Sequence, residues 1–190
     1  MKAFIAIIGI VMGLTVQAKE LTIFDSLAIQ QNMVIMDQAH STGLNWKVGD
    51  TNNYSLDMGF LKGKMIMSVK SIAADGIWMT QDVDLGFAGK QKMESLLDPN
   101  TGEIKKMLVN GKEQEIPKQD VDVVEVVEDR ITVPAGTFDC IHARLKDKQS
   151  NEETNAWINP QEIPISGMLK TVQPSQLGQV TILLTSFKKN

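Results

Sequence analysis

Two side chains that could support nucleophilic or metal chemistry stand two positions apart in the C-terminal half of the chain, Cys140 and His142. If this segment is a β-strand, both side chains point to the same face. A thiolate–imidazole pair or two metal ligands could form there. A structural zinc site needs four ligands, however, and no other Cys or His lies nearby in the sequence. We therefore favour a small buried thiol beside a histidine at the rim, because free cysteine packs as a small hydrophobe.

The methionines offer a second kind of chemistry. The chain has 11 of them, and Met65 and Met67 would share one face of a strand, where two thioethers could bind Cu(I). Met58, Met79 and Cys140 could supply further sulfur ligands. These methionines alternate with ordinary aliphatic residues instead of forming a sulfur-rich loop, and methionine commonly fills apolar space or lines adaptable binding surfaces. Copper binding is therefore an alternative to core packing and ligand lining.

Patterns typical of enzymes and of nucleic-acid binding are missing from the sequence. It contains no nucleophile-elbow serine, two-histidine zinc helix, phosphate-cradling glycine loop or calcium loop. We therefore expect a noncatalytic protein with no catalytic residues, no metal site and no cofactor. Nineteen Lys and Arg against 23 Asp and Glu give a net charge of −4, and Arg130 and Arg144 are the only arginines. Nucleic acid is an unexpected partner, because phosphate backbones require a basic excess.

Residues 1–18 have the form of a secretory signal peptide. Lys2 precedes an apolar run over residues 3–14, and Val16 and Ala18 occupy the −3 and −1 positions of a cut before Lys19. No later stretch approaches the roughly 20 apolar residues of a membrane-spanning helix. We therefore expect a signal peptide over 1–18, a single β-rich domain over 19–190, no transmembrane segment after cleavage, and a periplasmic or secreted location.

From residue 52 onward, apolar residues recur at every second position, which is typical of half-buried strands. The alternation covers residues 54–60 and 65–69, and it continues from residue 77 after a turn at Asp75 and Gly76. Three successive strands thus present one apolar face. The residues expected to line a ligand there are Tyr54, Leu56, Met58, Phe60, Met65, Met67, Val69, Ile77 and Met79.

Turn signals recur at short intervals along the rest of the chain, as in Asn110–Gly111 and residues 133–136. They predict a mainly β (α+β) fold, an antiparallel meander of nine or ten strands that forms a curved half-barrel or open barrel. Residues 26–38 are expected to form one N-terminal helix, with a strand over 33–36 as the alternative. Residues 123–127 and 182–184 are apolar on both sides, so they should be covered on both faces or lie centrally.

The C-terminal third also resembles a signature of exported, β-rich bacterial proteins of largely unknown function. The matching positions are Val133, Pro134, Ala135, Gly136, Thr137, Phe138, Asp139, Cys140, Trp157, Pro160, Pro164, Ile165, Gly167, Leu169 and Lys170, with a weaker match at Trp46, Val48, Gly49 and Asp50. The layout of leader, one helix and antiparallel meander looks like the half-barrels of the periplasmic lipoprotein carriers. That resemblance implies a concave sheet that holds acyl chains.

These observations predict a secreted, noncatalytic binding protein. A curved sheet with only one short helix to fill it should leave an apolar hollow for an apolar or amphipathic small molecule, such as a lipid or acyl chain. A periplasmic Cu(I)-binding protein using Met65 and Met67 is one alternative. The other is an envelope interaction module with a protein partner.

Overall fold

The computed structural model describes residues 43–116, 121–148, 150–175 and 178–190. The predicted signal peptide and the predicted helix over 26–38 lie outside these residues. The described chain contains one short 3₁₀ turn, Gly86–Ala88, and eleven strands. The strands are β1 (Thr51–Asp57), β2 (Lys62–Ala73), β3 (Gly76–Asp84), β4 (Lys90–Leu97), β5 (Ile104–Val109), β6 (Lys112–Gln114), β7 (Val121–Val133), β8 (Gly136–Asp147), β9 (Glu153–Ile158), β10 (Met168–Ser175) and β11 (Gly178–Lys188).

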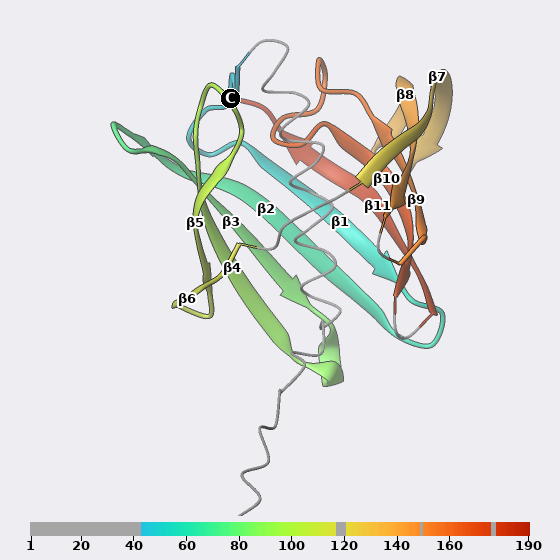
Figure 1. Cartoon of the computed structure of the whole chain (residues 1–190), viewed down its shortest axis with the longest axis horizontal. Helices are drawn as coiled ribbons and strands as arrows, with labels where there is room; N and C mark the ends of the chain where they lie inside the picture. The colour runs from blue at the N-terminus through green and yellow to red at the C-terminus, as the bar shows by residue number, and fades with distance from the viewer. Residues whose placement is uncertain (1–42, 117–120, 149, 176–177) are drawn as a thin grey trace, which may run out of the picture.

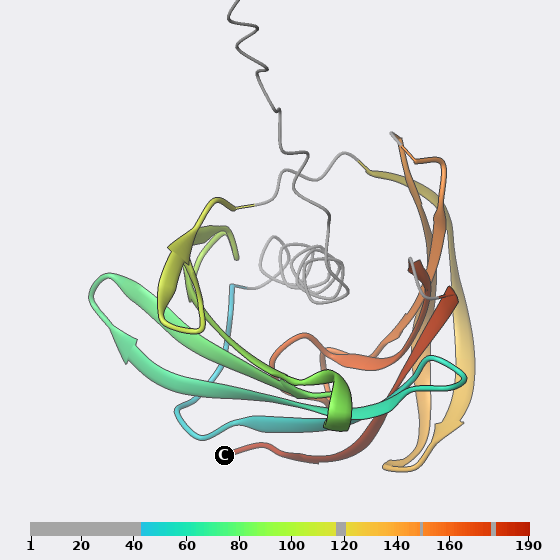
Figure 2. The same ribbon diagram turned by 90° about the horizontal axis from the view of Figure 1, so that it is seen from below.

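All eleven strands belong to one antiparallel sheet in the order β6-β5-β4-β3-β2-β1-β11-β10-β9-β8-β7. Each strand pairs with the strand that follows it in the sequence, except that β6 and β7 lie at opposite edges of the sheet (Figure 1). Strand β1 also pairs with β11. The sheet is strongly curved and does not close (Figure 2). The predicted antiparallel meander is confirmed, with eleven strands instead of nine or ten. The predicted N-terminal helix is not tested by the described residues.

The predicted turns connect these strands. Asn110 and Gly111 join β5 to β6 with φ angles of 50° and 79°. Both central residues of a type I′ hairpin turn require positive φ, which asparagine and glycine adopt most readily. Residues 134–135 form the predicted turn between β7 and β8. Local sequence therefore determines these hairpins.

The sheet has an inner face, which carries Tyr54 and Leu56 of β1, and an outer face, which carries Ser55. The pairing register extends the inner face, because Tyr54 lies opposite Met65 of β2 and Leu184 of β11. Buried side chains from β1, β2, β3, β10 and β11 form one hydrophobic cluster. The cluster lies inside the curve of the sheet, because only there do side chains from strands that are not neighbours converge.

Strand β7 contradicts the prediction made from its valines. Instead of lying centrally or being covered, β7 forms an edge of the sheet, and Val123 and Val126 are 64% and 57% exposed. The same prediction is confirmed for β11, which lies near the middle of the sheet with Ile182 and Leu184 buried. Apolar composition on both sides of a strand does not distinguish an interior strand from an exposed edge.

Candidate functional site

The inner face brings together eight of the nine residues predicted to line a ligand. Tyr54, Leu56, Met58, Met65, Met67, Val69, Ile77 and Met79 are at most 3% exposed and belong to the hydrophobic cluster. Direct cross-strand pairing joins Tyr54 to Met65 and Val69 to Met79. The strand period thus correctly predicted which side chains share this face.

The structure does not bring Phe60 together with these residues, because its side chain is 71% exposed. Strand β1 ends at Asp57, whose Oδ1 accepts a hydrogen bond from the Gly59 backbone N–H at 2.8 Å. That bond turns the chain before residue 60, so the alternation of a strand no longer applies.

Methionine is unusually abundant on the inner side of the sheet. All seven methionines of the described residues are at most 6% exposed: Met58, Met65, Met67, Met79, Met93, Met107 and Met168. Unbranched thioether side chains adapt their shape to different neighbours, which suits a surface that must repack around a ligand. The Met65 sulfur accepts a hydrogen bond of 3.3 Å from the Gln81 Nε2 atom. Coordination of Cu(I) by Met65 and Met67 stays a prediction.

Gln81, Ser95 and Gln173 are among the buried polar side chains that interrupt this apolar surface. Gln81 lies opposite Met67, Ser95 lies opposite Met79, and Gln173 lies opposite Val180, so all three belong to the inner face. Each is at most 2% exposed. Gln81 Oε1, Ser95 Oγ and both amide atoms of Gln173 have no hydrogen-bond partner among the described residues. Each buried polar group left without a partner costs about 1 to 3 kcal/mol.

The connection between β9 and β10 covers another part of the inner face (Figure 2). Asn52 donates a hydrogen bond of 2.7 Å from Nδ2 to the Pro164 carbonyl oxygen, and the Tyr54 hydroxyl donates to the Met168 carbonyl oxygen at 3.2 Å. Burial raises the pKa of Tyr54, and the hydrogen bond of 3.0 Å that Asn52 Nδ2 donates to the Tyr54 hydroxyl oxygen partly opposes this shift. The phenol is therefore a neutral hydrogen-bonding group that holds the connection in place.

Two residues of this connection have backbone conformations that restrict which side chains can stand there. Gly167 has φ of 67°, and a Cβ atom added there would lie 2.7 Å from the Cα atom of Pro160. Ile165 also has positive φ, at 60°, although β-branched residues rarely adopt it, and its side chain is fully buried. Ile165 and Gly167 thus lie in a connection that packs against the sheet.

Cys140 and His142 both lie on β8. The His142 ring stacks on Trp157 with 4.2 Å between centroids, and its Nε2 atom lies 2.9 Å from Asn155 Oδ1. Cys140 is buried, and burial raises the pKa of its thiol, which disfavours the reactive thiolate. Within the described residues, no group of three or more His, Cys, Asp and Glu side chains could hold a metal ion.

The sequence did not indicate the surroundings of Trp157. Its indole N–H donates a hydrogen bond of 2.8 Å to Asp129 Oδ2, and the Lys170 Nζ atom lies 4.5 Å from the ring centroid. The indole hydrogen bond lowers the pKa of Asp129, with a further contribution from the Arg130 backbone N–H. These contacts fix the tryptophan between strands β7 and β10.

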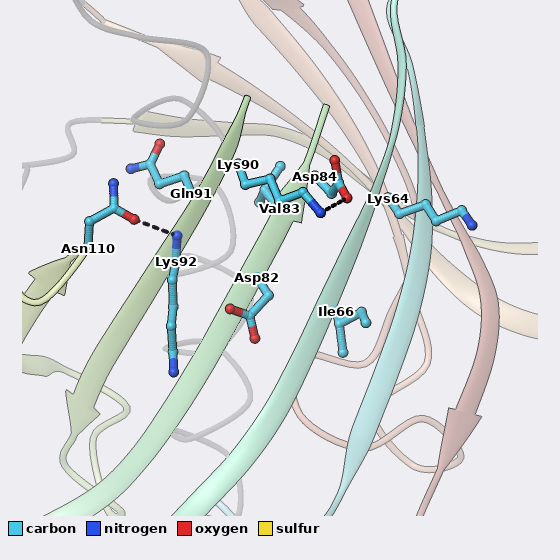
Figure 3. A pocket seen from close by; sticks show the side chains of 9 residues that line it. All are labelled: Lys64, Ile66, Asp82, Val83, Asp84, Lys90, Gln91, Lys92 and Asn110. Carbon is cyan, nitrogen blue, oxygen red and sulfur yellow. Dashed lines mark hydrogen bonds and ion pairs between the residues drawn. The ribbon is translucent and has the colours of Figure 1, made fainter. Parts of the chain in front are cut away.

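A shallow depression lies on the opposite side of the sheet, over β2, β3 and β4 (Figure 3). Lys90 forms an ion pair of 2.8 Å with Asp84, and Asn110 Oδ1 accepts a hydrogen bond from the Lys92 backbone N–H. Lysines and aspartates alternate around it, so their charges largely neutralise one another. The depression therefore has no strong preference for an anion or a cation. Its lining residues are Lys64, Ile66, Asp82, Val83, Asp84, Lys90, Gln91, Lys92 and Asn110.

No known protein family and no curated protein matches this sequence. The chain is similar to several solved structures at low sequence identity. A structure described as an exported protein with a YmcC-like fold from Bacteroides fragilis is 11% identical, with 77% of this chain and 99% of that chain covered and a TM-score of 0.40. A structure described as a lipoprotein from Parabacteroides distasonis is 14% identical, with 76% and 97% covered and a TM-score of 0.41.

A third structure is the Pseudomonas aeruginosa MucA/MucB complex, in which the matching chain is 9% identical, with a TM-score of 0.49. The match covers 85% of this chain and 56% of that chain. These similarities concern the fold alone. Among the described residues there is no helix with the length and apolar character needed to cross a membrane.

Proposed function

We propose that this periplasmic or secreted protein is a binding protein whose inner sheet face holds an amphipathic small molecule. The observation that carries the proposal is the set of buried polar atoms on Gln81, Ser95 and Gln173 that have no hydrogen-bond partner within the part of the chain that the structure describes. A face that served only as core would be more stable with apolar residues at these positions. Their presence is accounted for if a ligand supplies the missing hydrogen bonds.

The chemistry of this face defines the class of ligand. Methionine and aliphatic side chains provide apolar contact for a chain such as an acyl group. The Gln173 amide can both donate and accept a hydrogen bond, Gln81 Oε1 can accept one, and Ser95 Oγ can do either. The ligand should therefore combine an apolar chain with a polar group that both donates and accepts. A purely hydrocarbon ligand would leave the three polar side chains unsatisfied.

Ligand entry requires the buried side chains of the inner face to move. Tyr54, Met65 and Met67 are at most 2% exposed, so a ligand must displace whatever covers them. The β9–β10 connection is one element that packs on this face through Asn52 and Tyr54. The positive φ of Ile165 stores backbone strain in that connection, which lowers the cost of rearranging it.

Native mass spectrometry of the full chain purified from its own compartment tests the proposal. We expect an adduct that organic solvent extracts as an amphipathic molecule. The double variant Gln81→Leu with Gln173→Leu should fold and lose the adduct. Gln179→Leu is the matched control, because Gln179 is exposed on β11 next to Val180 and should keep the adduct. A bare mass for the unaltered protein, with no extractable molecule, would refute the proposal.

A second candidate function is an envelope interaction module with a protein partner. The observation that favours it is the long edge strand β7, whose valines are exposed. Capture of an envelope protein by the unaltered chain, but not by a chain altered on β7, would support this second function.

A further inference from the structure

Strand β7 is an edge strand of unusual length and composition. It has 13 residues and ends the sheet, and within the described residues it forms a ladder only with β8. One side of its backbone therefore presents N–H and C=O groups that no described strand pairs. Long edge strands of this kind are templates for pairing with another chain, and proteins usually shorten or cover them. The opposite edge, β6, follows that rule with only three residues.

The side chains of β7 add apolar surface to this free edge. Val123, Val124, Val126 and Val127 are between 43% and 64% exposed. Val126 lies opposite Ala143 and Val127 opposite His142, so the exposed valines occupy both faces of the strand. A segment that paired with β7 would contact valines on each side of the sheet. Beta-branched cross-strand neighbours stabilise such pairing.

The charge of β7 selects the partner. The strand carries four acidic residues, Asp122, Glu125, Glu128 and Asp129, against the single basic residue Arg130. Arg144 lies 3.4 Å from Glu125, and Lys148 lies 3.4 Å from Asp122, so these two carboxylates are partly compensated. Glu128 is exposed. The excess negative charge along the edge favours a partner strand that carries Lys or Arg.

The same charges disfavour a second copy of this chain. In a symmetric antiparallel pair of two β7 strands, one residue must lie directly opposite the same residue of the other copy. The reason is that two residues that lie opposite each other both direct their backbone hydrogen-bonding groups toward the partner strand, or both direct them away from it. A bulge between Val123 and Glu125 limits the regular part of β7 to residues 125–133. Identical charges oppose one another when the centre is Glu125, Glu128, Asp129 or Arg130.

The other centres are also unfavourable. Centring on Val127 opposes Glu125 to Asp129. Centring on Val126, Ile131, Thr132 or Val133 avoids like charges but leaves at most five regular residues paired, given the bulge and the end of the strand at Val133. Every long symmetric register therefore contains repulsion between like charges, which is destabilising in directly opposed pairs. The occupant of this edge is accordingly a different chain.

We propose that β7 is the docking strand for an extended segment of another protein, in which Lys or Arg alternates with β-branched apolar residues. The segment adds a twelfth strand next to β7. Backbone hydrogen bonds to the free edge supply affinity, and contacts with the exposed valines and acidic residues supply specificity. This interaction is independent of ligand binding at the inner face.

The probe for this proposal is a blocked peptide of about ten residues in which valine and lysine alternate. We expect the peptide to bind the full chain, with affinity that falls between about 50 and about 500 mM NaCl, and to protect the β7 amides from hydrogen exchange. Glu128→Lys should weaken binding about tenfold. Val126→Lys should also weaken it by removing apolar contact.

Two controls separate strand pairing from general attraction to an acidic protein. Glu103→Lys makes the same charge change at an exposed position outside the strands and should leave binding unchanged. A peptide of equal charge with a central proline should bind more weakly, because proline cannot donate a ladder hydrogen bond. Equal effects of Glu128→Lys and Glu103→Lys, or equal binding of the two peptides, would overturn the proposal. So would a dimer in sedimentation velocity that itself protects the β7 amides.

Discussion

Replacement of Gln173 by methionine is the sharpest test of how the inner face is used. Gln173 is 1% exposed on β10, opposite Val180, and neither its Nε2 nor its Oε1 atom has a hydrogen-bond partner among the described residues. Methionine has similar length and volume but contains no group that requires a hydrogen bond. The substitution therefore removes an unsatisfied amide and leaves the apolar contacts largely in place.

The expected gain in the free energy of unfolding is about 1 to 3 kcal/mol for protein without ligand. For a chain of this length, each kcal/mol raises Tm by roughly 2 to 4 °C, so Tm should rise by roughly 2 to 12 °C. Urea unfolding followed by tryptophan fluorescence measures the change as a higher midpoint with an unchanged slope. Gln179→Met, on the exposed side of the neighbouring strand, should change stability by less than about 0.5 kcal/mol.

The reasoning fails if Gln173→Met is as stable as, or less stable than, the unaltered protein. That result would mean that the amide is paired in solution and contributes to the fold, and the main observation behind the proposed ligand site would be lost. Native mass spectrometry of the same variant measures whether the bound molecule is lost. A gain in stability together with loss of the bound molecule is the expected pair of results, because the amide is then retained for binding at the expense of stability.

Three further substitutions test other parts of the structure. Gly167→Ala should destabilise the protein by at least about 1 to 2 kcal/mol in urea unfolding, because the residue has φ of 67° and its Cβ would lie 2.7 Å from Pro160 Cα; a neutral result would contradict this backbone geometry. Phe60→Ser should change stability by less than about 0.5 kcal/mol, since Phe60 is 71% exposed; a larger loss by the same measurement would place Phe60 in the core. The hydrogen bond from Lys70 lowers the pKa of Glu94. The ionised Glu94 therefore stabilises the folded state at pH values above the ordinary glutamate pKa of about 4.3, and this stabilisation is lost as the pH falls below that pKa. Glu94→Gln should therefore lower the urea midpoint at about pH 7 and have little effect at about pH 3; equal effects at both pH values would contradict the assignment.

The pattern of single strands could be read from the sequence, because the period of two is a local property. The alternation over residues 54–60, 65–69 and 77–79 predicts one shared face, and the pairing of Tyr54 with Met65 and of Val69 with Met79 agrees with it. The assignment failed at Phe60, where the hydrogen bond between Asp57 and Gly59 ends the strand. Periodicity carries no information about a chain reversal that a single side-chain hydrogen bond produces.

The candidate site was predictable in its apolar part and not in its polar part. The period of two puts Gln81 on the same side as Met79, but no local pattern shows that its Oε1 atom lacks a partner among the described residues, because that depends on every neighbour in space. The packing of residues 159–167 on the inner face was also unpredictable. It depends on contacts such as that between Asn52 and Pro164, which are 112 residues apart in the chain.

The sequence by itself determined an antiparallel β-meander, its hairpin turns and the apolar side of its first three strands, since short-range alternation and turn residues set each of them. Only the tertiary structure decided which strands lie inside the sheet and which form its edges. The valine-rich strand β7 and the apolar strand β11 look alike in sequence, yet β11 is buried near the centre and β7 is exposed at the edge. The physical reason is that strand order follows from pairing between distant segments, above all the pairing of β1 with β11, which no local pattern encodes.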